Sequence, residues 1–126
     1  MITNCIAVGV GGCIGAILRY LIGLIPVKET MLFPIKTFGI NVAGCILIAL
    51  LVVIMSRTAN NSFPEWLNLL LKVGICGGFT TFSTFALEST DLIKNGNVGI
   101  AFTYMILSVV IGVGVIVAIT AAQVRG

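Results

Sequence analysis

The sequence predicts an all-α membrane protein with four transmembrane helices in a single domain over residues 1–126. Of its 126 residues, 59% are hydrophobic and only 9% are charged, which is a membrane-protein composition. The apolar residues also gather in four segments of about 20 residues, the length that a helix needs to cross a bilayer. We expect these helices at about residues 2–25, 37–55, 67–93 and 98–122.

The composition also argues against several classes of function. The chain has no histidine, no nucleophile paired with a base and no metal-ligand cluster, so we do not expect an enzyme. Its seven basic residues are scattered, which gives no support for nucleic-acid binding. The four cysteines lie in apolar segments without a C-x-x-C pair, and we interpret them as small buried hydrophobic residues.

The first segment carries glycines on one helical face and a single charge toward its end. Gly11 and Gly15 form a G-x-x-x-G pair, which permits the close approach of a second helix. Arg19 continues the same face. Its guanidinium either extends to the membrane interface or attracts anions in a vestibule.

The second segment places two polar side chains on one face, because Thr37 and Asn41 are four residues apart. An amide is costly in lipid, so Asn41 should face protein or water. It either forms a hydrogen bond between helices or serves as a donor that faces a pore. A polar loop over residues 57–66, interrupted by Pro64, leads to the third segment.

The chain is organised around residues 74–88 of the third segment, GICGGFTTFSTFALE. Glycines mark its first half, and hydroxyl residues alternate with phenylalanines in its second half. A helix in lipid must satisfy its backbone polar groups internally, and this composition is poor for a regular helix. We therefore predict a break at mid-membrane, which would mark an ion or substrate site. The alternative is a packing face of small and hydroxyl residues.

Two further spacings point to shared faces. Residues three apart would form a ridge if the second half of the third segment is helical: Phe79, Phe82, Phe85 and Glu88. In the fourth segment, Tyr104 and Ser108 are four residues apart and could offer two hydroxyls from one face.

The basic residues are almost evenly divided between the two sides of the membrane. Four crossings place Arg57, Lys72 and Arg125 on one side and four basic residues on the other, Arg19, Lys28, Lys36 and Lys94. Orientation follows the Lys/Arg bias, which is nearly absent here. We predict dual topology with an antiparallel homodimer as its product; the alternative is one fixed orientation.

Residues 77–85, GGFTTFSTF, with Glu88 behind them, resemble the signature of the Fluc (CrcB) fluoride channels. The glycines at 11–15 followed by Arg19 and Tyr20, and Thr37 with Asn41 and Gly44, are also similar to that family. The resemblance therefore covers the whole chain. Lys36 departs from it, because the family usually has a glycine before the threonine of the second segment.

The resemblance implies a fluoride-selective channel that exports fluoride from the cytoplasm across the cell membrane by passive electrodiffusion. It implies an antiparallel, dual-topology homodimer with two pores and a third helix that is broken at mid-membrane. A structural sodium ion at the dimer centre would be held by backbone carbonyls of Gly77 and Thr80. Such carbonyls at a helix break suit a hard cation.

The resemblance also implies which residues line the pores. Phe82 and Phe85 would present ring edges, which carry partial positive charge and suit an anion. Arg19 and Glu88 would be vestibule or interface charges. Polar groups along the path would be Thr37, Asn41, Ser83, Thr84, Tyr104 and Ser108.

Two other classes also fit four crossings. A small multidrug transporter is a dual-topology dimer of this size, but proton-coupled export of cations generally uses an acidic residue deep in the membrane. The first segment has none. A structural subunit would explain the small-residue packing faces but not the dense polar break.

Overall fold

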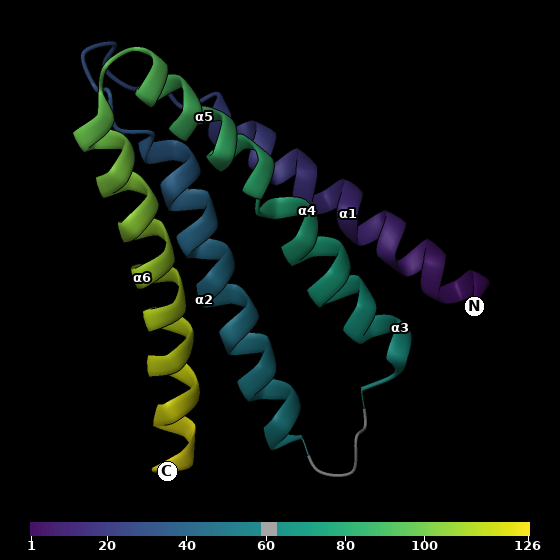
Figure 1. The fold of residues 1–126 in the computed structure, drawn as a ribbon. Helices are drawn as coiled ribbons and strands as arrows, with labels where there is room; N and C mark the ends of the chain where they lie inside the picture. The colour runs from purple at the N-terminus through teal and green to yellow at the C-terminus, as the bar shows by residue number, and fades with distance from the viewer. Residues whose placement is uncertain (59–62) are drawn as a thin grey trace.

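The computed structural model describes residues 1–58 and 63–126 and is built from helices (Figure 1). In this part of the chain, four helical spans are long and apolar enough to cross a membrane. They are α1 (Ile2–Gly23), α2 (Ile35–Arg57), a third span over Glu65–Lys94, and α6 (Val98–Val124). Part of the expected loop at 57–66 lies outside the described residues. The chain is a multi-pass membrane protein, as its composition predicted.

Prolines and one glycine set the boundaries of several helices. Pro34 directly precedes α2, and Pro64 directly precedes the third span. Proline suits this position because the first backbone N–H groups of a helix have no acceptor within the helix, so a residue without an N–H loses no helical hydrogen bond there. Gly96 has φ of 82°, a left-handed conformation that glycine adopts readily, in the turn from α5 to α6.

The third span consists of four pieces with one break. They are α3 (Glu65–Asn68), the π-helical η2 (Leu69–Cys76), α4 (Gly77–Phe79) and α5 (Phe82–Lys94). Thr80 and Thr81 are extended, with ψ of 159° and 114°, so the helix is interrupted near the middle of this 30-residue span. The predicted break is therefore confirmed, although Gly77 and Gly78 are themselves helical.

The break corrects one expectation about the phenylalanines. The spacing by three predicted a ridge that begins at Phe79, but this residue ends α4, ahead of the extended threonines. Its side chain is buried, with 9% exposed. Phe82, Phe85 and Glu88 follow the break on α5 and keep helical spacing.

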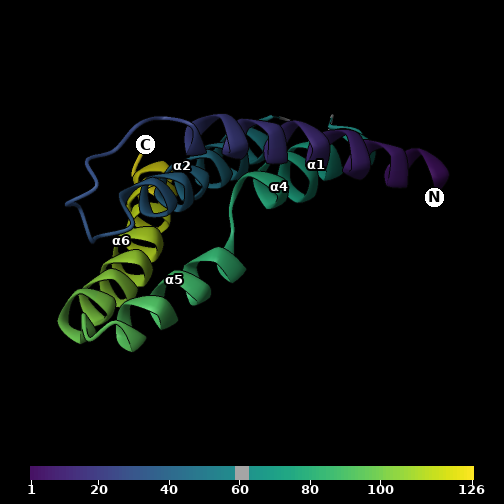
Figure 2. The same ribbon diagram turned by 90° about the horizontal axis from the view of Figure 1, so that it is seen from above.

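The break allows the third span to change its packing partner. Before the break, η2 and α4 lie along α1, and after it α5 packs mainly against α6. Seen from above, α5 turns away from the direction of α4 and α1 (Figure 2). Because α2 packs along α6, the molecule has two helix groups that α5 connects.

Glycines bring α1 and the third span into backbone contact. A Cβ atom built at Gly11 would lie 2.9 Å from the Gly74 Cα, and one built at Gly15 would lie 2.7 Å from the Phe79 backbone nitrogen. A Cβ at Gly78 would lie 3.0 Å from the Gly12 Cα. The predicted G-x-x-x-G contact is thus confirmed, and its partner is the glycine-rich half of the third span.

Large apolar side chains cover the outside of the chain. On α6, Ile106 and Val117 are each 57% exposed. Such faces are stable where lipid or another protein covers them. By contrast, Tyr104 is fully buried, the largest such side chain among the described residues. It belongs to a buried cluster with Leu92 and Ala101, against which Phe33, Phe38 and Phe85 pack.

We predict that Gly15→Ala lowers the stability of the purified protein, because the new methyl group meets backbone atoms that cannot rotate away. Overpacking of this kind costs roughly 1–3 kcal/mol. Thermal unfolding in detergent measures the effect. Gly9→Ala is the matched control on the same helix, since a Cβ there has nothing within 4 Å. Equal unfolding temperatures for the two variants would contradict the close packing.

Candidate functional site

Asn41 on α2 satisfies the exposed backbone of the helix break. The Thr81 backbone N–H donates to Asn41 Oδ1 at 2.8 Å, and Asn41 Nδ2 donates to the Thr81 carbonyl at 3.1 Å. One amide side chain therefore replaces both backbone partners that a strand or helix would supply to Thr81. At membrane depth each unpaired backbone group costs roughly several kcal/mol, and the pairing with Asn41 avoids this cost for the N–H and the carbonyl of Thr81.

The break also diverts two backbone donors. In a continuous α-helix the Thr81 N–H would bond the Gly77 carbonyl, and the Thr84 N–H would bond the Thr80 carbonyl. Instead the first donates to Asn41, and the second donates to the Thr81 hydroxyl at 3.2 Å. The carbonyls of Gly77 and Thr80 thus lose their usual helical donors. These are the two carbonyls predicted to bind sodium, and carbonyl oxygens suit hard cations.

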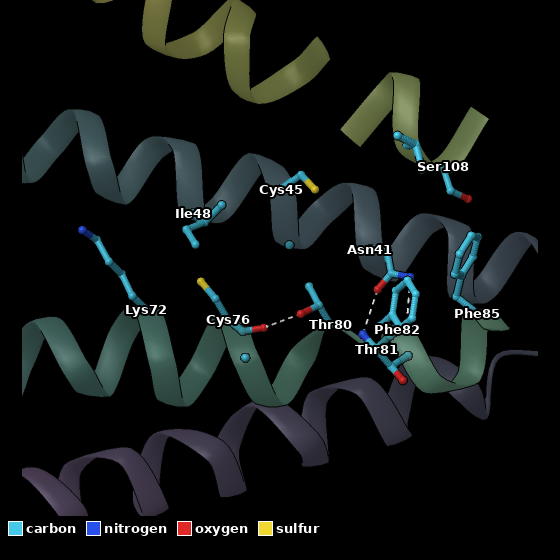
Figure 3. A pocket seen from close by; sticks show the side chains of 13 residues that line it. Asn41, Cys45, Ile48, Lys72, Cys76, Thr80, Thr81, Phe82, Phe85 and Ser108 are labelled. Carbon is cyan, nitrogen blue, oxygen red and sulfur yellow. Dashed lines mark hydrogen bonds between the residues drawn. The ribbon is translucent and has the colours of Figure 1, made fainter. Parts of the chain in front are cut away.

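A cavity of about 410 Å³, here called the central cavity, lies between α2, the third span and α6 (Figure 3). Its wall includes Asn41, Thr81 and Ser108 as polar groups and the rings of Phe82 and Phe85. The Ser108 hydroxyl is buried and has no hydrogen-bond partner among the described residues. A serine in a helix often donates to the backbone carbonyl four residues earlier. The Ser108 hydroxyl does not, so its hydrogen could be donated to an occupant of the cavity.

The phenylalanines of the central cavity belong to a chain of aromatic contacts. The ring centroids of Phe82 and Phe85 are 5.6 Å apart, and those of Phe85 and Tyr104 are 5.1 Å apart. Phe33 in the first loop lies 5.4 Å from Tyr104. Phe82 is the open end of this chain, because 79% of its side chain is exposed.

A second cavity, of about 430 Å³, lies on the other side of Thr81 and contains the charged side chains Arg19, Lys36 and Glu88. We call it the charged cavity. Thr37 and Thr84 also line it, and Thr81 lines both cavities. The helix break therefore forms part of the boundary between the two.

Two hydroxyl groups hold the Glu88 carboxylate. Thr37 donates to Glu88 Oε1 at 2.7 Å, and the Tyr104 hydroxyl donates to Glu88 Oε2 at 2.8 Å. Both bonds suit an ionised carboxylate, which only accepts. Glu88 thus joins α2, α5 and α6 at the wall of the charged cavity.

The structure distributes the predicted site residues over these two cavities. The central cavity has six of them: Asn41, Gly77, Thr80, Phe82, Phe85 and Ser108. The charged cavity has four: Arg19, Thr37, Thr84 and Glu88. Tyr104 lines neither cavity, but it contacts two residues that do: its hydroxyl donates to Glu88, and its ring packs against Phe85. Ser83 also lines neither and is exposed, with its hydroxyl 3.4 Å from that of Thr81.

Other lining residues were not predicted from the sequence as part of the site. Thr81 pairs with Asn41 across 40 residues of sequence, so local patterns do not reveal its position. Cys45 and Cys76 line the central cavity, and so does Lys72. Helical spacing from predicted site residues could have indicated them. Cys45 follows Asn41 by four residues, and Cys76 and Lys72 precede Thr80 by four and eight.

Comparison with known proteins gives one consistent result. Residues 6–120 match the family described as CrcB-like protein, Camphor Resistance (CrcB). The fluoride-specific ion channel FluC of Phocaeicola vulgatus is 45% identical over 104 residues, which cover 82% of this chain and 84% of the relative. Fluoride-specific ion channel FluC 1 of Nitrobacter hamburgensis is 43% identical over 121 residues, or 92% of this chain and 91% of the relative. The family match spans nearly the whole chain, which therefore belongs to the CrcB-like family, as its motifs predicted.

Proposed function

We propose that this chain forms a fluoride-selective channel that exports fluoride from the cytoplasm by passive electrodiffusion. Similar proteins carry the name of a fluoride-specific ion channel, a class that is not enzymatic. The observation that carries the proposal is the buried, unpartnered Ser108 hydroxyl in the same cavity as Phe82 and Phe85. A free donor beside aromatic rings suits an anion that must lose part of its water.

The two cavities give this proposal a path. An anion would enter the charged cavity, pass the hydroxyls of Thr81 and Thr84 at the helix break, and reach Phe82, Phe85 and Ser108 in the central cavity. Beyond the charged cavity, the groups around Phe82 and Phe85 are hydroxyls, an amide and ring edges, and Lys72 is the charged side chain in the wall of the central cavity. Several modest sites permit fast exit, whereas one strong cationic site would retain the ion.

We further propose that the working unit is an antiparallel homodimer with dual topology. Phe82 and Ser83 lie at the break and are exposed in the single chain. A hydroxyl and an irregular backbone at membrane depth require protein or water around them. A second copy of the same chain would supply that cover, and the nearly even division of basic residues favours the antiparallel arrangement.

A structural sodium ion would fit at the centre of that dimer. The carbonyls of Gly77 and Thr80, freed by the break, would hold it. When bound, the ion would supply a fixed positive charge that offsets part of the cost of moving an anion into the membrane.

Ion efflux from liposomes tests the proposed function. Liposomes that contain the purified protein are loaded with fluoride and chloride, and potassium permeability is supplied by an ionophore. We expect fluoride to leave and chloride to remain. Retention of fluoride by a properly folded protein would overturn the channel and favour export of cationic drugs.

We predict that Phe82→Ile and Phe85→Ile each reduce fluoride efflux, because isoleucine fills the space but has no positive ring edge. The loss of an aromatic contact worth about 1.5 kcal/mol corresponds to roughly tenfold. Phe102→Ile is the control, since Phe102 is 53% exposed on α6 and lines neither cavity. Wild-type rates of fluoride efflux from both cavity variants would contradict a path lined by these aromatic rings.

We predict that Asn41→Asp inhibits efflux by at least about tenfold, because a carboxylate next to the path repels anions by several kcal/mol at short range. It also loses the amide donor to the Thr81 carbonyl. Asn41→Leu separates the two effects, since it loses the hydrogen bonds without adding charge. Full efflux through the aspartate variant would restrict Asn41 to a packing role.

We predict that removing sodium lowers the unfolding temperature of the purified protein. A ligand present at 100 times its Kd stabilises by about 2.7 kcal/mol, enough for a shift of several degrees. Unfolding is compared in sodium chloride and in N-methylglucamine chloride of equal ionic strength. Identical unfolding curves in the two salts would contradict a stabilising sodium ion.

A further inference from the structure

Lys36 is held at the junction of the first two helices. Its Nζ donates to the carbonyl of Gly23, the last residue of α1, at 2.7 Å. A cation in this place satisfies a carbonyl that the end of a helix leaves unpaired and complements the negative end of the helix dipole. An ammonium group has three N–H donors, so this bond leaves two free.

The same ammonium-bearing side chain lines the charged cavity. The charged groups in the wall of this cavity are Arg19, Lys36 and Glu88, and the remaining titratable group is the neutral phenol of Tyr20. With Lys36 the wall carries two positive charges and one negative charge, a net charge of +1. Without Lys36, Arg19 and Glu88 would cancel and the cavity would be neutral.

We propose that Lys36 is an anion-capture residue that makes the entrance of this channel electropositive. The inference rests on the proposed function and adds to it a residue that concentrates anions at the entrance. A fixed charge at the mouth of a low-dielectric cleft raises the local concentration of the opposite ion. Its bond to Gly23 fixes the ammonium at the rim, so it attracts the anion without entering the path beyond Thr81.

This role differs in a measurable way from simple capping of α1. Attraction by an exposed charge is screened by salt over a Debye length of about 10 Å at 0.1 M and about 3 Å at 1 M. A change in helix packing does not depend on ionic strength in this way. Capture should therefore matter at low fluoride and low salt and disappear when both are high.

The test uses single-channel fluoride currents of Lys36→Gln in planar bilayers. At low fluoride and low ionic strength, we expect its conductance to be roughly threefold below wild type, as suits the loss of one steering charge. The difference should disappear at high fluoride and high salt. Lys36→Arg should stay close to wild type under both conditions, because it retains the charge.

Lys28→Gln is the matched control, since Lys28 lies in the loop that leads to α2, is exposed and lines neither cavity. It should match wild type at all concentrations. Lys36→Met, which keeps the apolar stem, replaces the glutamine variant if that one fails to assemble. Equal currents in wild type and Lys36→Gln, or a loss that does not depend on salt, would overturn the capture role. Absence of current from the wild type would instead overturn the proposed function.

Discussion

The pairing of Asn41 with the Thr81 backbone is the interaction on which the rest of the structure depends. A helix break in a membrane exposes backbone groups that lipid cannot satisfy. Asn41 satisfies the N–H and the carbonyl of Thr81, at 2.8 and 3.1 Å. With that cost offset, the third span can leave α1 and continue along α6 as α5.

In the central motif the glycines permit helix packing and the threonines form the helix break. Gly74 and Gly78 remain in helices and allow backbone contact with α1. Thr80 and Thr81 form the break, and the Thr81 hydroxyl caps α5 by accepting from the Thr84 N–H. The packing face and the break, two alternatives on the sequence, are thus both present, in successive parts of one motif.

Electrostatics separates the two cavities that meet at this break. The charged cavity combines Arg19 and Lys36 with a carboxylate that Thr37 and Tyr104 hold in place. The wall of the central cavity has one charged side chain, Lys72, and around Phe82 and Phe85 it offers hydroxyl and amide groups. Charge at an entrance attracts an ion over distance, whereas neutral donors within a path replace water and still release the ion. This order of surfaces is consistent with the proposed channel.

The sequence by itself determined the four spans and the existence of a break, because hydropathy and helix propensity are local properties. The G-x-x-x-G spacing also predicted close packing of α1. Which residues break the helix depended on tertiary contacts, since Asn41 lies 40 residues from Thr81. The bond of Lys36 to Gly23 and the three-helix connection through Glu88 are likewise contacts between distant segments. Only the folded chain decided these, because residue spacing fixes which side chains share a face of one helix but not which face of another helix they meet.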